Sequence, residues 1–238
     1  MLLCDLNCDM GEGIGNDEAI MQYITSANIA CGYHAGDEDT MRQTVALAKR
    51  FNVAIGAHPS FQDRENFGRS EMSLSPSEIY QLVQQQMKIL QKIAYEYDMG
   101  VDHVKPHGAL YNMAARNKEI AKAIAQAVYD YNKNLVLFGL SGSLSLKEAM
   151  ALGLTAKSEV FADRTYQDDG SLTPRSQPDA MIEDDEKALQ QALQMVKTGT
   201  VRSLSGNEVK ITADTICIHG DGPHALAFAK KIYHALSI

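Results

Sequence analysis

Short apolar runs alternate along the chain with longer segments in which apolar residues recur every three or four positions. The short runs are typical of strands and predict seven of them, at residues 2–6, 27–30, 53–57, 103–105, 135–139, 159–162 and 215–219. The longer segments have the period of amphipathic helices. They predict helices at residues 38–51, 117–131, 143–152, 183–198 and 223–236, and one more that begins at Ser75 and ends before Gly100.

Several of these helices carry recognisable end signals. Asp37 is placed to cap the helix at residues 38–51. The run Ser75-Pro76-Ser77-Glu78 combines a capping box with proline at the first helical position. Gly153 and Gly199 directly follow two other predicted helices, at positions where a left-handed backbone suits glycine.

Repeated alternation of strands and helices implies a parallel sheet that is covered by helices on its outside. Periodicity does not decide whether such a sheet is open or closed into a barrel. Polar motifs follow nearly every predicted strand, and the chain has no glycine-rich dinucleotide fingerprint. Both observations favour a barrel, and we expect residues 1–238 to form one (β/α) barrel domain.

The composition narrows the class of protein. The 238 residues are 45% hydrophobic and 22% charged, which is enough to bury a core. The net charge of -8 argues against a nucleic-acid partner, and no apolar run approaches the roughly 18 residues of a membrane span. The N-terminus lacks the basic and apolar regions of a signal peptide. We therefore expect a cytoplasmic protein whose cysteines, which form no CxxC pair, are reduced thiols.

Histidines gather at the carboxyl ends of the predicted strands, and only His234 lies in the interior of a predicted helix. The other six lie at or just after the strand ends: His34, His58, His103, His107, His219 and His224. The same ends carry most of the acidic residues that lie outside helices. Because the carboxyl ends of parallel strands face one side of the fold, the sequence predicts an active site of His, Asp, Glu and Lys residues there.

The first strand presents polar residues at alternate positions. Asp5, Asn7 and Asp9 share one face of it by the two-residue period of a strand, so they are expected to converge towards the interior. Since buried acids are rarely without a function, this arrangement indicates a functional site. The alternative is a polar plug that fills the barrel.

The fourth strand carries a second alternating set. His103, Lys105 and His107 lie on one face for as long as the strand lasts. Two imidazoles and an ammonium group are costly together unless carboxylates neutralise them. This set is therefore expected to act together with Asp9 or Glu12.

Other polar residues have structural roles as alternatives. His58 precedes Pro59, where it could form only a loop hydrogen bond. Arg164 either pairs with the neighbouring Asp163 or binds a substrate carboxylate through two hydrogen bonds. Asp221 flanks the start of the last helix, where capping is the ordinary role.

Metal and nucleotide sites have no sequence pattern in their favour. The chain contains no HExxH pattern, its one HxxxH spacing (His103 and His107) begins on a predicted strand and not on a helix, and any further metal ligands would come from different strands, so a divalent metal is left open. Gly11, Gly13 and Gly15 have the spacing GxGxG, without the GK[ST] of a P-loop or a complete GxGxxG. We interpret them as a tight loop near the site and not as an ATP-binding motif.

Six longer motifs carry a family resemblance. In chain order they read DLNCDMGEG, SANIACGYHAGD, IGAHPSFQDRENFGR, HVKPHGALYN, EVFADRTY and CIHGD. The chain resembles the LamB/YcsF family in these motifs and in their order, from Leu3 to the last helix. The resemblance implies a distorted seven-stranded (β/α) barrel of the glycoside hydrolase/deacetylase type.

The resemblance also implies a reaction and partners. The implied activity is that of an ATP-dependent 5-oxoprolinase, in which 5-oxo-L-proline, water and ATP yield L-glutamate, ADP and phosphate. Two further subunits, B and C, are implied as partners. We expect these subunits to bind ATP and to activate the lactam by phosphorylating its carbonyl oxygen, after which this chain hydrolyses the activated species. A homo-oligomer is also left open.

The implied reaction assigns candidate roles to the polar residues. Opening an unstrained lactam requires activated water, a stabilised oxyanion and protonation of the leaving nitrogen. The base is expected to be a carboxylate or a histidine, Lys105 to stabilise the oxyanion, and Arg69 or Arg164 to hold the substrate carboxylate. The catalytic candidates are Asp9, Glu12, His58, Lys105 and His107. The substrate-binding candidates are Asn7, His34, Arg69, His103, Asp163, Arg164, His219 and Asp221.

Two other functions are left open. The first is a metal-dependent deacetylase or amidohydrolase that acts alone on a small amide or sugar. The second is a scaffold or substrate-binding subunit without catalytic activity, with the chemistry on subunits B and C.

Overall fold

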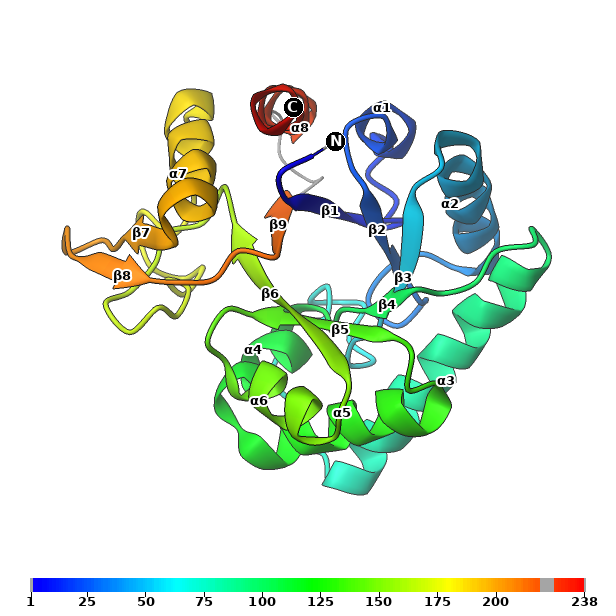
Figure 1. Ribbon diagram of the computed structural model, residues 1–238. Coiled ribbons are helices and arrows are strands. Elements are labelled where there is room, and N and C mark those ends of the chain that lie inside the picture. The colour runs from blue at the N-terminus through cyan, green and yellow to red at the C-terminus, as the bar shows by residue number, and fades with distance from the viewer. Residues whose placement is uncertain (1, 219–224, 238) are drawn as a thin grey trace.

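The computed structural model describes residues 2–218 and 225–237. Within them, seven parallel strands close into a barrel in the order β1-β2-β3-β4-β5-β6-β9 (Figure 1). The strands are β1 (Asp5–Met10), β2 (Ser26–Ala30), β3 (Ala54–His58), β4 (His103–Val104), β5 (Val136–Leu140), β6 (Thr155–Phe161) and β9 (Thr215–Ile218). The predicted seven-stranded barrel is therefore confirmed, and the carboxyl ends of all these strands lie on one side.

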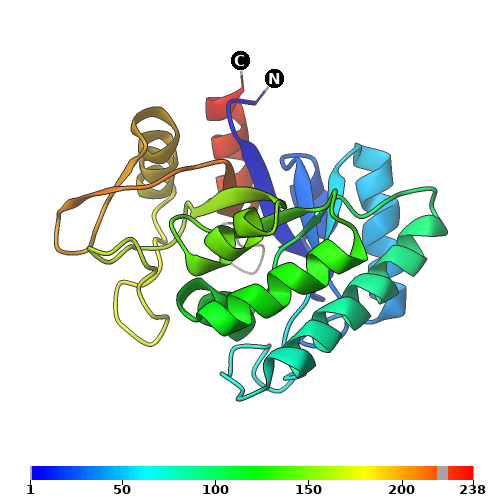
Figure 2. The same ribbon diagram turned by 60° about the horizontal axis from the view of Figure 1, so that its bottom comes forward.

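Helices surround the barrel on its outside (Figure 1). Those in the described residues are α1 (Asp17–Met21), α2 (Glu38–Phe51), α3 (Pro76–Tyr95), α4 (Gly108–Arg116), α5 (Lys118–Tyr131), α6 (Leu144–Ala151), α7 (Asp185–Thr198) and α8 (Ala225–Leu236). Helices α3 and α5 pack side by side, as Figure 2 shows. None of the described helices is both long and apolar enough to cross a membrane.

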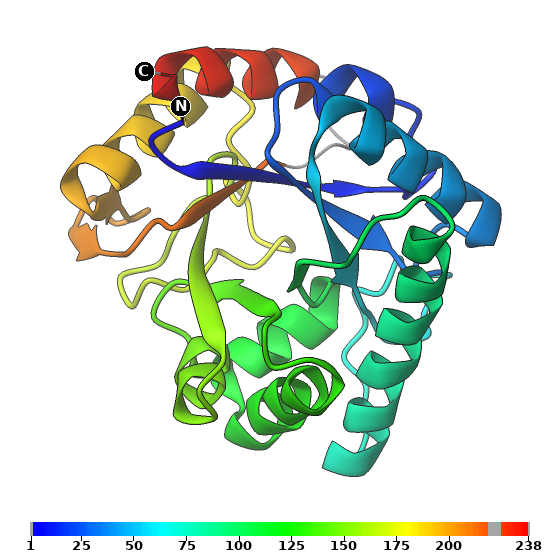
Figure 3. The same ribbon diagram turned by 45° about the vertical axis from the view of Figure 1, so that its right-hand side comes forward.

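The two ends of the described chain meet. Helix α8 packs against both α7 and α1, which closes the ring of helices (Figure 3). The amide of Leu3 donates to the carbonyl of Leu236 at 3.0 Å. The first and last elements therefore support each other across the closure of the barrel.

The predicted helix ends are present. Asp37 accepts a hydrogen bond from the Thr40 amide at 2.8 Å and caps α2. Ser75 and Glu78 form the reciprocal capping box of α3. Gly199 caps α7 in the left-handed conformation with φ 66°. The predicted start of the last helix at residue 223 lies outside the described residues, and α8 is described from Ala225.

Several predicted boundaries were wrong. The first strand begins at Asp5 and continues to Met10 instead of ending at residue 6, because its polar residues belong to the strand and face the barrel interior. Two short helices, α1 and α4, were not predicted. An antiparallel hairpin of β7 (Thr200–Arg202) and β8 (Glu208–Lys210), which lies outside the barrel next to α7, was also missed (Figure 1). Elements this short have too few residues to show a period.

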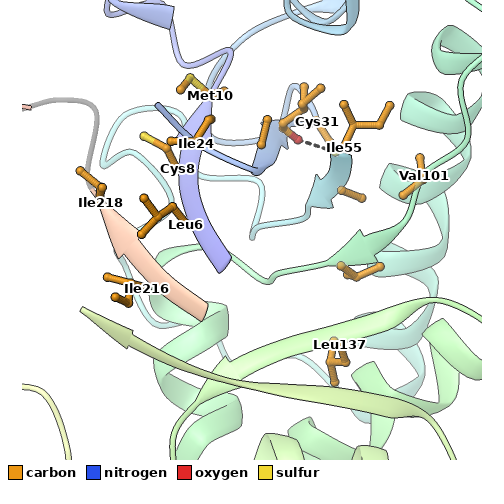
Figure 4. Packing of buried hydrophobic residues seen from close by; sticks show 14 of the residues in the cluster. Leu6, Cys8, Met10, Ile24, Cys31, Ile55, Val101, Leu137, Ile216 and Ile218 are labelled. Atoms are coloured by element: carbon orange, nitrogen blue, oxygen red, sulfur yellow. Dashed lines mark hydrogen bonds between the residues drawn. The ribbon is translucent and has the colours of Figure 1, made fainter. Parts of the chain in front are cut away.

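The apolar core lies between the barrel and its helices. Leu6, Cys8 and Met10 alternate along β1 and are all buried (Figure 4). Ile55 of β3 and Ile216 of β9 belong to the same buried cluster. The residues between these positions point the other way, into the barrel, and many of them are polar. The interior of the barrel is thus a polar layer enclosed by an apolar one.

Gly56 of β3 is expected to tolerate no side chain. A Cβ atom there would lie 2.2 Å from the ring of His103, which is itself buried. We expect Gly56→Ala to lower the free energy of unfolding in urea by about 1–3 kcal/mol, the usual cost of overpacking. Gly100→Ala is the matched control, since its Cβ would meet no heavy atom within 4 Å. Equal stability of the two variants would contradict this packing of β3 against His103.

Candidate active site

A cavity of about 770 Å³ opens at the carboxyl ends of the strands, within the usual range for ligand sites. All five predicted catalytic residues line it: Asp9, Glu12, His58, Lys105 and His107. Asp9 lies near the end of β1, His58 ends β3, and Lys105 and His107 follow β4 in alternation. The parallel strands therefore bring together residues that are far apart in the sequence.

The barrel interior below the cavity is a hydrogen-bonded polar layer. The Asn28 side-chain amide donates to Asn7 Oδ1 at 2.8 Å and to Asp9 Oδ1 at 2.9 Å. Asn7 donates in turn to Thr215 Oγ1 at 2.7 Å. His103 Nε2 lies 2.8 Å from Asn28 Oδ1, and its ring stacks on the ring of an aromatic residue of β5, Phe138. This layer positions Asp9 from beneath.

Two predicted substrate-binding residues, Asn7 and His103, belong to this layer. Both are buried, and neither lines the cavity. Their polar atoms are engaged by neighbours inside the barrel. This arrangement is the one that the polar-plug alternative expects, and substrate binding by Asn7 and His103 stays a prediction.

The buried His103 makes stability depend on pH. Burial lowers the pKa of His103 to about 3, against about 6.5 in an unfolded chain. Below pH 6.5 the unfolded chain binds a proton that the folded chain does not, so stability falls as the pH falls. Between pH 7 and pH 5, the free energy of unfolding is expected to fall by about 2 kcal/mol less in His103→Gln than in the wild-type chain, as measured by urea unfolding at both pH values. The exposed His234→Gln is the control, and an unchanged pH dependence in His103→Gln would refute this assignment.

Lys105 is the central cation of the site. Its Nζ lies 2.8 Å from Asp9 Oδ1, 2.9 Å from Glu159 Oε1 and 3.1 Å from Cys217 Sγ. Burial by itself would lower the pKa of Lys105, but the charges of Asp9 and Glu159 outweigh it and raise this pKa well above its ordinary value. Lys105 is therefore a fixed ammonium group that faces the cavity.

Three imidazoles and Glu12 form a compact group, named here the histidine cluster: Glu12, His34, His58 and His107. The rings of His34 and His107 stack with their centroids 3.8 Å apart. His34 Nε2 lies 3.1 Å from Glu12 Oε1, and His58 Nε2 lies 2.8 Å from His107 Nδ1. Burial and the neighbouring His58 lower the pKa of His34 to about 3 and that of His107 well below its ordinary value. These two rings are therefore neutral near pH 7.

His34 is placed differently from the prediction. It was expected to bind substrate, but it is buried behind His107 and does not line the cavity. Its Nδ1 is held by Ser60 Oγ at 3.0 Å. Both of its ring nitrogens are thus engaged, by Ser60 and by Glu12, and substrate binding by His34 stays a prediction.

The two predicted carboxylate-binding arginines both line the cavity but differ in their surroundings. Arg69 is exposed, and its guanidinium lies 5.0 Å from the centre of the Phe67 ring. Arg164 is buried, and it donates from Nε to the Ala180 carbonyl at 3.1 Å and from Nη2 to the Thr173 carbonyl. Burial lowers the pKa of Arg164 to about 10. Arg164 is thus bound to its own loop.

Of the remaining predicted substrate-binding residues, Asp163 falls within the described part of the chain. Asp163 is buried and lies outside the cavity lining. His219 and Asp221 lie outside the described residues, as does His224.

Two residues of the site, Tyr111 and Glu159, were not predicted from the sequence. Tyr111 of α4 is buried, lines the cavity and contacts Phe161 edge-on at 6.0 Å. Burial, followed by the charge of Glu159, raises the pKa of Tyr111 and keeps it a neutral phenol. Glu159, on β6, is the second carboxylate partner of Lys105. Tyr111 follows His107 by about one helical turn, a relation that becomes visible only when α4 is recognised.

The glycine loop after β1 is tight, as predicted. Gly11, Gly13 and Gly15 all have positive φ, which glycine adopts without strain. The Gly11 amide donates to Asp17 Oδ2 at 2.8 Å. The Asp17 carboxylate thus accepts the hydrogen bond of a loop amide that, in a phosphate-binding loop, would donate to the phosphate.

A closed parallel barrel that holds carboxylates, an ammonium group and imidazoles at the carboxyl ends of its strands has the architecture of a (β/α) barrel enzyme. Residues 4–238 match the LamB/YcsF family, and the chain belongs to this family. The predicted family membership is thereby confirmed.

Individual relatives agree along nearly the whole chain. The chain is 54% identical to the 5-oxoprolinase A subunit of Bacillus subtilis (strain 168), over 98% of this chain and 92% of that protein. It is 56% identical to the 5-oxoprolinase A subunit of Bordetella pertussis (strain Tohama I), over 98% of this chain and 94% of that protein. Among solved structures, a lactam utilization protein from Thermus thermophilus superposes with a TM-score of 0.91 at 43% identity, covering 98% of this chain and 95% of that one.

Proposed function

We propose that this chain is the hydrolytic A subunit of an ATP-dependent 5-oxoprolinase, which opens the lactam of 5-oxo-L-proline to give L-glutamate. The observation that carries the proposal is the pair formed at the cavity by the buried Lys105 and the partly buried Asp9, whose Nζ and Oδ1 atoms lie 2.8 Å apart. An ammonium group beside a carboxylate supplies both requirements of amide hydrolysis, which are charge stabilisation and proton transfer. Relatives that are more than half identical carry this enzyme's name.

Asp9 is the proposed base. Its Oδ1 accepts hydrogen bonds from Lys105 and Asn28, which orients the carboxylate, and its Oδ2 lies 3.2 Å from His58 Nε2. The neutral rings of His34 and His107 have lowered pKa values and are therefore weaker bases than an ordinary imidazole. In the proposed sequence Asp9 takes a proton from the water that attacks the phosphorylated lactam carbon and returns it to the ring nitrogen as the C–N bond breaks. This leaves an acyl phosphate, which a second water hydrolyses to L-glutamate and phosphate.

Lys105 and Arg69 bind the two charged parts of the substrate in this proposal. The Lys105 ammonium stabilises the oxyanion that develops on the water-derived oxygen at the lactam carbon, since the carbonyl oxygen carries the phosphoryl group. Arg69 is favoured over Arg164 for the substrate carboxylate, because two donors of Arg164 are already bound to backbone carbonyls. Arg164 then holds the loop at residues 165–180 over the cavity.

ATP is proposed to act through partner subunits B and C, which phosphorylate the lactam carbonyl oxygen. The engagement of the Gly11 amide by the Asp17 carboxylate supports this division of labour, since an acidic group there repels phosphate. A single barrel domain over residues 1–238 and a cytoplasmic location stay predictions from the sequence.

The proposal is tested by glutamate formation from 5-oxoproline and ATP. The assay compares this chain alone, its B and C partners alone, and all three together. Turnover only in the full mixture is the expected result. No turnover in any mixture of folded proteins would overturn the proposed function, and tight binding of ATP by this chain alone in calorimetry would overturn the division of labour.

A further inference from the structure

In the histidine cluster, each ring has one nitrogen that faces away from the other rings, and the hydrogen-bond partner of that nitrogen determines where the ring proton lies. His58 Nδ1 is 2.7 Å from the Lys105 carbonyl oxygen, and His107 Nε2 is 2.9 Å from the Phe67 carbonyl oxygen. A carbonyl oxygen only accepts hydrogen bonds, so each of these two nitrogens must carry a proton.

The same reasoning applies to His34 through one further step. Its Nδ1 is 3.0 Å from Ser60 Oγ. Ser60 donates its only hydroxyl proton to the Phe61 carbonyl at 2.8 Å, so Ser60 Oγ accepts from His34 Nδ1. All three rings are therefore anchored with the proton on the outer nitrogen.

The inner atoms of the histidine cluster are consequently all acceptors. In neutral rings, the inner nitrogens His34 Nε2, His58 Nε2 and His107 Nδ1 present lone pairs. They meet at short range, with 2.8 Å between His58 Nε2 and His107 Nδ1. Glu12 Oε1 lies 3.1, 3.7 and 4.0 Å from the inner nitrogens of His34, His107 and His58. Converging lone pairs repel one another unless a positive charge, such as a metal ion, lies between them.

We propose that Glu12, His34, His58 and His107 bind one divalent transition-metal ion, with Zn²⁺ as the best match. Three imidazole nitrogens and one carboxylate oxygen are ligands that Zn²⁺ favours. Tetrahedral bonds of about 2.0–2.1 Å place neighbouring ligand atoms about 3.3 Å apart, and the four donor atoms here lie within 4.8 Å of one another. Histidines that ligate metals characteristically donate their other N–H to a carbonyl or similar acceptor, as these do.

The site is built from four separate loops. Glu12, His34, His58 and His107 follow or end β1, β2, β3 and β4 in turn, one ligand from each strand. This explains why no local ligand spacing occurs in the sequence. Glu12, His58 and His107 also line the cavity, so an ion can enter from it.

The inference goes beyond the proposed function, because metal binding does not require lactam turnover. Should both hold, the ion supplies a Lewis acid next to Asp9, whose Oδ2 is 3.2 Å from His58 Nε2. The readouts below are binding readouts, so their failure is distinct from failure of the glutamate assay.

The test uses the full chain stripped with a chelator and then titrated with ZnCl₂ in calorimetry, with elemental analysis after dialysis. We expect one equivalent of Zn²⁺ per chain and a rise in Tm on binding. His34→Gln and Glu12→Gln are expected to weaken binding by more than about 100-fold, and each variant is checked for folding by circular dichroism. His234→Gln, on the exposed face of α8, is the control that retains full affinity.

Co²⁺ gives a second readout that requires no variant. Substitution by Co²⁺ in the wild-type chain is expected to give the intense visible absorption of a tetrahedral site with nitrogen and oxygen ligands. Folded wild-type chain that retains no metal overturns the proposal. Equal affinity in His34→Gln, Glu12→Gln and wild type overturns it as well, because the ion would then lie elsewhere.

Discussion

Replacing Lys105 by methionine is expected to reduce turnover by about 10²–10³-fold, the usual cost of losing one oxyanion donor. The same change should lower the free energy of unfolding by about 3–5 kcal/mol, because Asp9 and Glu159 would lose a buried cationic partner. Methionine keeps the length of the side chain, so the loss of charge is the main change. Steady-state kinetics of the full assembly and urea unfolding of the chain measure the two effects.

A double variant separates catalysis from stability. Adding Glu159→Gln to Lys105→Met removes one uncompensated carboxylate and should recover part of the lost stability without recovering turnover. Lys230→Met, at an exposed position of α8, is the control for both measurements. Folded Lys105→Met with wild-type turnover would remove Lys105 from the mechanism.

Replacing Asp9 by asparagine is expected to lower kcat by about 10²–10⁴-fold, as for loss of a general base. Asparagine has nearly the same shape, and its carbonyl oxygen still accepts from Asn28 and Lys105, so the barrel should fold and assemble with its partners. Asp5→Asn is the matched control. Asp5 lies on the same face of β1 at the opposite end, where it accepts from Ser26 and Thr215, and it does not line the cavity.

The pair of Asp9 and Asp5 variants also decides between two functions of the chain. A scaffold or substrate-binding subunit would keep turnover in Asp9→Asn as long as the complex assembles. Turnover lost in an assembled complex with Asp9→Asn, but kept with Asp5→Asn, places the chemistry on this chain. Size-exclusion chromatography of the mixture with B and C reports the assembly.

Local physical chemistry made much of the fold predictable. The caps at Asp37 and Ser75 depend on residues within three positions of each other, so the sequence alone identified where α2 and α3 begin. The two-residue period of β1 is enough to place Asp5, Asn7 and Asp9 on one inward face. Histidines after parallel strands predicted that a site forms at the carboxyl ends, because parallel strands end on one side.

Local sequence patterns did not predict the roles of individual polar residues. His103 and His107 share one alternating pattern, yet one stacks on Phe138 inside the barrel and the other lines the cavity. The difference depends on how far each position lies along the barrel axis. That depth follows from the register between strands, which is set by packing across the whole barrel.

The chain's sequence by itself determined the class of fold, the family and the side of the barrel on which polar groups converge. These follow from period, capping and long motifs, which are properties of neighbouring residues. Only the tertiary structure decided that Lys105 is shared by Asp9 and Glu159, that Arg164 binds its own loop, and that His34 lies behind His107 beside Glu12. The physical reason is that these contacts join residues from separate strands and loops, whose distance in space depends on barrel closure and not on their spacing in the chain.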